Sequence, residues 1–172
     1  MIGPMQRALV LFPQASQLDV VERMRRRYDP QARFIAAHVT IVFPFDDPMP
    51  DAELRAHVLE ATTGLVPFTL HFSGVTMVDD YVFLNPTVGA DRLVALHNRL
   101  YTGKLLRHRS RTHAFQPHVT LGRVEDPRTR AEVVEIMRHS IGDFDAEVSA
   151  VSVFGLTGPE QGAIDATIPL RQ

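Results

Sequence analysis

The stretch that decides the fold is His38-Val39-Thr40-Ile41-Val42-Phe43-Pro44-Phe45, and a second stretch, His118-Val119-Thr120-Leu121-Gly122-Arg123, repeats its opening. Both stretches begin with the tripeptide His-Val-Thr and continue into an apolar residue. The two histidines lie 80 positions apart, a little under half of the 172 residues. We therefore expect the rest of the chain to form a scaffold that brings the two tripeptides face to face.

Each tripeptide reads as the start of a β-strand with one chemical face and one packing face. Successive side chains on a strand point to opposite sides, so His38 and Thr40 share one face. His118 and Thr120 share a face of their own strand in the same way. Two such strands placed together would gather two imidazoles and two hydroxyls.

Such a cluster suits phosphodiester chemistry, which needs a base for the attacking oxygen and an acid for the leaving oxygen. Histidine can do either task near neutral pH. The threonine hydroxyls can donate hydrogen bonds to phosphate oxygens, and a cationic imidazole opposes the negative charge that builds at phosphorus. The arrangement requires no metal and no cofactor. One His-x-Thr on a strand is usually structural, but two copies at matching places are hard to explain in that way.

The order of predicted elements also repeats loosely. Apolar runs and turn residues predict strands at 7–12, 36–43, 68–73, 75–78, 81–85 and 118–124, helices at 16–28, 51–62, 91–103 and 126–139, and a final long hairpin of 144–154 with 163–170. Each copy of the repeat carries one His-Val-Thr strand. A helix that follows each motif strand favours a mixed fold of helices and strands.

Composition excludes several classes of function. With 45% hydrophobic and 22% charged residues the chain is ordinary for a soluble protein, and a net charge of −2 supplies no global field for nucleic acid or membrane. The absence of cysteine excludes disulfides, thiolate nucleophiles and cysteine-ligated zinc. No stretch approaches the roughly 18 apolar residues of a membrane span. We expect a cytoplasmic monomer of one domain over 1–172, with no membrane partner.

The two motif segments, the second taken from Phe115 to Arg123, resemble those of the 2H phosphoesterase superfamily, and most closely its bacterial 2′-5′ RNA ligases and RNA 2′,3′-cyclic phosphodiesterases. The resemblance implies a bilobal α+β fold with a pseudo-two-fold repeat. It also implies antiparallel sheets that line a central cleft, with helices packed outside and two similar lobes in a single domain.

The same resemblance implies an activity and a set of site residues. The activity would be metal-independent hydrolysis of a 2′,3′-cyclic phosphate on an RNA end or a small cyclic nucleotide, or reversible 2′-5′ ligation. His38 and His118 would be the acid/base pair, and Thr40 and Thr120 would hold the phosphate. Arg123 stands where such proteins often carry a basic residue, although strict alternation from His118 places it on the other face.

Further candidates each have a structural explanation as well. Tyr81 and Phe83 alternate on one strand and could stack a base, although core packing is the usual role of such residues. Phe45 and Phe115 flank the motifs and could line the mouth of the cleft. His71 shares a face with two hydroxyl residues and could also look into it.

Several basic and histidine residues also have an ordinary structural explanation. The basic segment 104–113 could clamp phosphate, close as a lid, or be a solvated loop. The arginines at 25–27 would complement a helix dipole rather than bind RNA. His57, His97 and His139 fall in predicted helices and are expected at the surface.

Two other functions compete with hydrolysis. A non-catalytic RNA- or nucleotide-binding module would keep the same cleft without turnover, although all four motif side chains are intact. A histidine-ligated metal hydrolase would need a carboxylate beside the histidines, and Asp46 and Asp47 would have to fold back to supply it.

Overall fold

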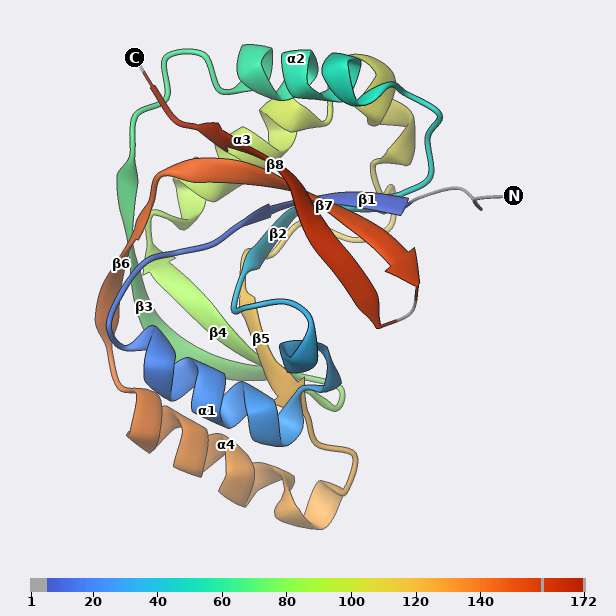
Figure 1. The fold of residues 1–172 in the computed structure, drawn as a ribbon. Helices are drawn as coiled ribbons and strands as arrows, with labels where there is room; N and C mark the ends of the chain where they lie inside the picture. Colours follow the sequence, from blue (N-terminus) through green and yellow to red (C-terminus); the bar gives the residue numbers. More distant parts are fainter. Residues whose placement is uncertain (1–5, 159, 172) are drawn as a thin grey trace.

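The computed structural model describes residues 6–158 and 160–171 and has an α+β fold (Figure 1). Pro159 of the predicted final turn and the two ends of the chain lie outside the described residues. The elements in chain order are β1 (Gln6–Leu11), α1 (Leu18–Tyr28), the 3-10 helix η1 (Pro30–Arg33), β2 (Val39–Phe45), α2 (Asp51–Ala61), β3 (Phe68–Val78), β4 (Tyr81–Val88), α3 (Ala90–Leu100), the 3-10 helix η2 (Gly103–His108), β5 (Val119–Arg123), α4 (Pro127–Ile141), β6 (Phe144–Val148), β7 (Ala150–Gly158) and β8 (Gln161–Pro169).

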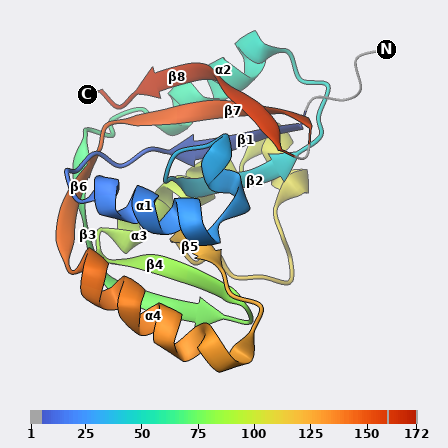
Figure 2. The same ribbon diagram turned by 60° about the horizontal axis from the view of Figure 1, so that its bottom comes forward.

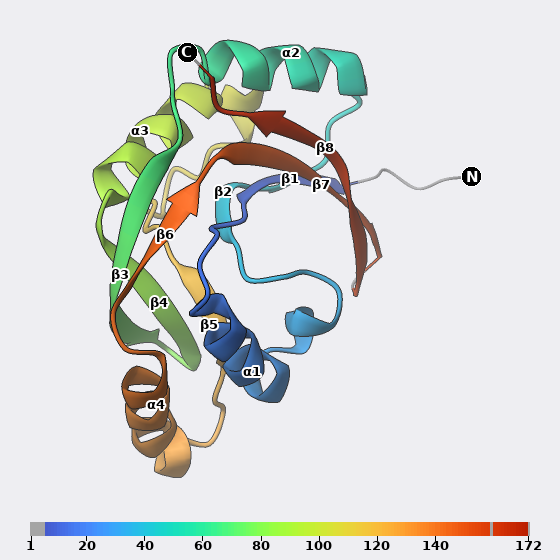
Figure 3. The same cartoon turned by 60° about the vertical axis from the view of Figure 1, so that its left-hand side comes forward.

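The eight strands form one antiparallel sheet in the order β6-β3-β4-β5-β2-β1-β7-β8. The motif strands β2 and β5 are the middle pair, and in the described part of the chain their ladder consists of Val39 opposite Val119. The sheet curls, so that the half with β3, β4 and β6 turns away from the half with β1, β7 and β8 (Figure 3). The expected antiparallel α+β fold is confirmed, with its two sheets joined into one at the central pair.

Each half of the sheet is covered by one pair of helices (Figures 1 and 2). Helices α1 and α4 contact each other and pack on β5 and β3. Helices α2 and α3 contact each other and pack on β8 and β2. Strand, helix, 3-10 helix, motif strand and helix follow in the same order from β1 to α2 and from β4 to α4. The division into two lobes of a single domain remains a prediction.

The packing face of each motif strand is buried in the main core. Val39, Ile41, Val119 and Leu121 are all fully inaccessible to solvent. Burying one such side chain contributes roughly 1.5–3 kcal/mol to folding. The core therefore holds these residues in place and with them the opposite, chemical face of each strand. Among the described residues, no helix has the length and apolar composition needed to span a bilayer.

Two strand predictions were wrong. The predicted strand 144–154 is two strands, β6 and β7, with a break at Ser149. Before the break β6 pairs with β3, and after it β7 pairs with β1 in the other half of the sheet. The apolar pattern continues across Ser149, so periodicity alone could not reveal the change of partner. Conversely, Gly74 does not end a strand but lies at an irregularity inside β3.

The close packing of α1 on β5 leaves no room for a side chain at Gly122, which can be tested. A Cβ at this position would lie 2.4 Å from the Cβ of Tyr28 and 2.7 Å from its carbonyl oxygen. We expect Gly122→Ala to lower the free energy of unfolding by roughly 1–3 kcal/mol, measured by urea denaturation, because the helix must move. Gly74→Ala is the control, since its Cβ would lie 3.7 Å from Asn85, an ordinary contact. Equal stability of the two variants would contradict the close approach.

Candidate active site

The buried valine pair at the centre of the sheet fixes where the two motifs meet. In an antiparallel pair, residues equally far from a matched position face each other across the strands. The register of the pair therefore sets His38 opposite Thr120 and Thr40 opposite His118. All four side chains are half-buried and lie on the face opposite to the buried valines. The predicted meeting of the two tripeptides follows from this register.

The two imidazoles are held in the same way. Nδ1 of His38 lies 2.8 Å from the carbonyl oxygen of Ala36, and Nδ1 of His118 lies 2.7 Å from that of Gln116. A carbonyl oxygen can only accept, so Nδ1 carries a proton and donates it in both residues. In the neutral ring Nε2 then holds a lone pair, and each histidine can take up or release a proton there.

The environment disfavours the cationic form of both rings. Burial lowers the pKa of His38 to about 4; the hydrogen bond to Ala36 opposes this shift and the nearby Arg25 charge adds to it. Burial also lowers the pKa of His118, against its bond to Gln116. His38 is therefore neutral at neutral pH in the free protein, and an anion placed between the rings would raise both pKa values again.

Beyond the valine pair the two motif strands separate, and buried backbone groups on their inner edges need other partners. On the β5 side the partner is Arg25 of α1, whose side chain is 1% exposed. Its guanidinium donates to the carbonyl oxygens of Thr120, at 3.2 Å, and Ile35, at 3.0 Å. The carboxylates of Asp29 and Glu22 balance its charge. Beyond its predicted role at the helix dipole, Arg25 thus ties the second motif to the segment before the first.

Helix α3 supplies the hydrogen-bond partners for backbone groups on the inner edge of β2. Nδ1 of His97 donates to the carbonyl oxygen of Ile41 at 2.8 Å, and the Phe43 N–H donates to the Tyr101 hydroxyl at 3.1 Å. His97 is 5% exposed, so the prediction of a surface residue was wrong. The ring of Phe115 stacks on His97 at 4.0 Å between centroids. Phe115 therefore packs behind β2 rather than beside the histidine pair.

The sequence carries a signal for the buried positions of both Arg25 and His97. Arg25 follows Val21 by four positions, and His97 follows Leu93 by four, so each lies on the apolar stripe of its helix. A polar side chain on such a stripe must find buried partners. Which carbonyl it finds depends on the separation of the motif strands, which the sequence does not reveal.

The predicted stacking strand lies directly beside the second motif. The ring of Phe83 stacks on the imidazole of His118 at 3.8 Å between centroids, and Tyr81 stacks on Phe83 at 6.2 Å. Tyr81 is 44% exposed, so part of its side chain is open to solvent beside Phe83. Aromatic surfaces of this kind can stack a nucleobase.

A bulge in β5 brings Arg123 to the face of the site. Phe83 pairs with Thr120 and Tyr81 with Arg123, with a register shift between the two pairs. Paired residues share a face, so Arg123 lies on the same face as Thr120, contrary to strict alternation. Its guanidinium binds Asp80 at 2.6 Å and lies over the Tyr81 ring. Arg123 therefore stands at the outer end of the Phe83–Tyr81 row.

Two other predicted lining residues lie apart from the histidine pair. Phe45 is 3% exposed, with its ring against His108 and the Arg7 guanidinium, so it has no surface to offer a ligand. His71 binds Asp145 through Nδ1 at 2.7 Å, where β3 meets the edge strand β6. Neither side chain is therefore placed to line the space between the two histidines.

The basic segment 104–113 is largely held in place by the protein itself. Arg107 and His108 both bind the buried carboxylate of Asp47, and their hydrogen bonds hold the pKa of Asp47 well below its usual range. Lys104 pairs with Glu53, and Arg109 donates to the Asn98 side chain at 2.6 Å. Asp47 is therefore committed to the segment η2 and does not fold back toward the histidines.

The described residues also bear on the metal-hydrolase hypothesis. Within 6–158 and 160–171, no three side chains of the His, Cys, Asp or Glu type lie close enough together to hold a metal ion. The two motif histidines thus have no third candidate ligand among these residues.

Comparison with known sequences places both motifs in one family match. The sequence model described as the 2′-5′ RNA ligase superfamily matches residues 12–159. A Bacillus licheniformis protein, provisionally named a phosphoesterase, is 32% identical over 125 residues, which cover 68% of this chain and 70% of the relative. A Bacillus pumilus protein with the same provisional name is 31% identical over 121 residues, covering 68% and 69%.

Solved structures share the fold. Escherichia coli LigT, solved with 3′-AMP, superposes with a TM-score of 0.68 at 19% identity, over 98% of this chain and 99% of LigT. A Thermus thermophilus protein superposes with a TM-score of 0.64 at 15% identity, over 97% of this chain and 98% of that protein. At these identities the likeness establishes the fold, and the expected architecture is confirmed.

The lowered pKa of His38 predicts how stability depends on pH. The unfolded chain, with a pKa of 6.5, binds the proton before the folded chain, with a pKa of about 4, so stability falls as pH drops between these values. The loss from His38 is at most about 3 kcal/mol. Urea midpoints from neutral pH down to about pH 4 measure it. His38→Gln should flatten the decline, whereas His139→Gln, at an exposed site on α4, should reproduce the wild-type curve.

Proposed function

This chain belongs to the 2′-5′ RNA ligase superfamily, which makes it an enzyme of the phosphoesterase class, and we propose that it hydrolyses 2′,3′-cyclic phosphates by two-histidine acid/base catalysis. The proposed substrates are RNA ends or small cyclic nucleotides. No metal or cofactor takes part in the proposed reaction.

One observation carries the proposal. His38 and His118 immediately precede two paired strands, and each donates from Nδ1 to the carbonyl oxygen two residues before it. Both rings therefore have Nε2 available for proton transfer, on the face that also carries Thr40 and Thr120. A phosphate between the rings would meet one proton acceptor, one proton donor and two hydroxyls.

The proposed hydrolysis moves one proton on each side of phosphorus. Nε2 of the neutral histidine removes a proton from water while the water oxygen bonds to phosphorus. The bond from phosphorus to one ribose oxygen breaks, and Nε2–H of the cationic histidine protonates that oxygen. The product is a ribose phosphomonoester with one hydroxyl free. A ribose 5′-hydroxyl in place of water would instead give a 2′-5′ diester by the same transfers.

The environments of the two rings suggest which histidine has which role. The pKa of His38 is lowered to about 4 by burial, and the Arg25 charge adds to that effect. His38 is therefore proposed as the base for the attacking oxygen, and His118 as the acid for the leaving oxygen. An anionic phosphate favours protonation of His118 as it binds.

The ligands of structural relatives agree with a nucleotide substrate. Escherichia coli LigT has been solved with 3′-AMP, with phosphate and with NADP+. In this chain the exposed Tyr81 ring and the Phe83 ring beside His118 would stack the base of a cyclic nucleotide, and Arg123 would stand near its outer edge. Thr40 and Thr120 would hold the phosphate oxygens.

Substitution of either histidine tests the proposal. His38→Ala and His118→Ala should each reduce kcat for a 2′,3′-cyclic nucleotide by about 10²–10⁴-fold, because one proton transfer is lost. The double variant should be little slower than either single variant, since the two groups act as a unit. Release of the phosphomonoester measures the rate.

The controls separate catalysis from other effects. His139→Ala, exposed on α4, should turn over like the wild type. A chelator should leave the rate unchanged, because the proposed transfers need no metal. Turnover that persists undiminished in both motif variants would refute the proposal, and turnover lost to the chelator would favour a metal hydrolase.

The pH dependence of kcat/KM tests the assignment of roles. Activity needs neutral His38 and protonated His118, so kcat/KM should rise through about pH 4 and fall again through the pKa of His118, below 6.5. Both limbs should lie at higher pH in kcat, because the bound phosphate raises both pKa values. A profile that only rises toward alkaline pH would contradict an acid role for either histidine.

A further inference from the structure

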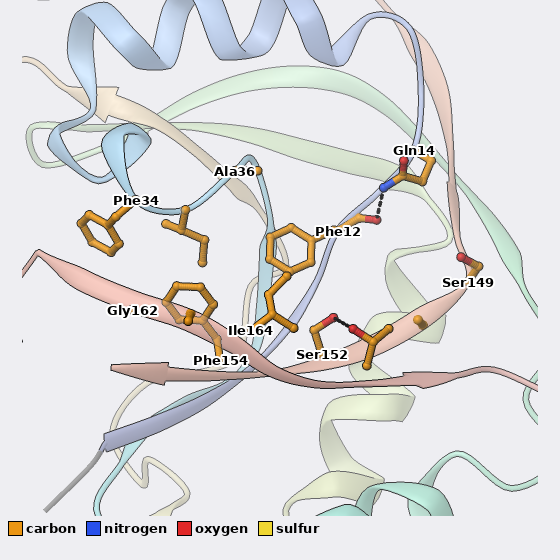
Figure 4. Close-up of a pocket in the computed structure, with 13 residues that line it drawn as sticks. Phe12, Gln14, Phe34, Ala36, Ser149, Ser152, Phe154, Gly162 and Ile164 are labelled. Carbon is orange, nitrogen blue, oxygen red and sulfur yellow. Dashed lines mark hydrogen bonds between the residues drawn. The ribbon is translucent and has the colours of Figure 1, made fainter. Parts of the chain in front are cut away.

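A cavity of about 550 Å³ lies beside His38, and no step of the proposed hydrolysis uses it (Figure 4). Its walls come from the end of β1, the segment before β2, and both strands of the β7–β8 hairpin. This volume is within the usual range of small-ligand pockets, about 300–1,000 Å³. Water, the nucleophile of hydrolysis, needs no such space.

The cavity is continuous with the position of the base. Ala36, whose carbonyl oxygen accepts from His38, is one of the lining residues. Phe12 is another, and its ring centroid lies 6.2 Å from that of His38. Val10 pairs with Thr40, so the side chains of Val10 and Phe12 share the face of the site. A ligand in the cavity can therefore reach a phosphate at His38.

The lining suits a neutral aromatic group. All of the described lining residues are uncharged, so nothing there would pair with a second phosphate or a carboxylate. Phe12, Phe34 and Phe154 supply three rings, with Phe34 and Phe154 toward one end of the cavity and Phe12 near its middle in Figure 4. Ser149 stands toward the other end and Ser152 near the middle, and both hydroxyls can bond the polar edge of a ring system.

The other half of the site differs. His118 stacks on Phe83, beside the exposed Tyr81 and the cationic Arg123. The two histidines thus have separate aromatic surroundings on opposite sides of the phosphate position. A substrate with an aromatic group on one side only would leave the cavity empty.

We propose that this cavity binds the nucleobase of a second nucleoside, the one attached to the phosphate on the His38 side. The inference rests on the proposed function, in which the oxygen at His38 is the attacking one. That oxygen would be a nucleoside 5′-oxygen when the cavity is filled and water when it is empty. The enzyme would then distinguish a dinucleoside phosphodiester from a mononucleoside cyclic phosphate by the base in the cavity.

Equilibrium binding to the full chain carrying His118→Asn tests this, because turnover is then slowed by the loss of one proton transfer. The two probes are 2′-5′-linked diadenosine monophosphate and the same diester with an abasic second ribose. We expect the dinucleoside to bind at least about tenfold more tightly, since the stacking of one base is worth that much. Calorimetric titration gives both Kd values.

A matched pair of variants locates the effect. Ile164 lines the cavity and is 52% exposed, and Ile136 on α4 lies outside it and is 44% exposed. Added to the His118→Asn chain, Ile164→Glu should reduce the tenfold difference to under about twofold, because it places a carboxylate in the neutral cavity. Ile136→Glu should preserve the difference. Neither change removes a core side chain, so both variants should fold.

The outcomes separate this inference from the proposed function. Equal Kd values for the two probes, or a difference that survives Ile164→Glu, would overturn the cavity assignment. Hydrolysis of 2′,3′-cyclic AMP by the wild-type chain does not depend on the cavity. Hydrolysis with equal Kd values would refute the cavity alone, and a tenfold preference without hydrolysis would refute the proposed function alone.

Discussion

A single backbone pairing, Val39 with Val119, is the constraint on which the rest of this structure depends. It joins the two halves of an eight-stranded sheet at the first residue of each motif strand. Since the pairing is antiparallel, it also sets each motif histidine opposite the threonine of the other motif. A shift of one residue would turn the imidazole and hydroxyl of one strand into the core. Full burial of both valines opposes such a shift, because it would expose them and bury polar groups instead.

Because this pairing is short, some backbone groups of the motif strands need hydrogen-bond partners, and side chains from the helices supply them. Once the motif strands separate, the carbonyl oxygens of Ile41 and Thr120 have no strand partner on the inner edge. His97 from α3 bonds the first and Arg25 from α1 bonds the second. The helix that precedes each motif strand thus supports the motif strand of the other half. The two halves are therefore coupled through side chains as well as through the sheet.

The repeated topology does not give the two histidines equal surroundings. His38 lies beside an uncharged cavity and near the buried Arg25, whereas His118 lies under a stacked aromatic ring with Arg123 at the end of the row. A reaction with one base and one acid needs this kind of difference, because two equivalent imidazoles would have no preferred direction of proton transfer. The fold supplies the symmetry that brings the rings together, and the local sequences supply the asymmetry.

The sequence by itself determined the motif strands and the chemical face of each, because alternation and the doubled tripeptide are local properties of the chain. The antiparallel α+β architecture was implied by the resemblance of the two motif segments to a known family. The sequence also placed Phe83 and Tyr81 on one face of a strand, with stacking of a base as an alternative to core packing. Only the tertiary structure decided the break at Ser149, the carbonyl groups that Arg25 and His97 bind, and the side of the sheet on which Arg123 lies. Each of these depends on where a strand finds its partner: a bulge in β5 reverses the alternation before Arg123, and the separation of the motif strands leaves carbonyl groups that only buried side chains can reach. Pairing partners and bulges arise from contacts distant in sequence, so residue spacing does not predict them.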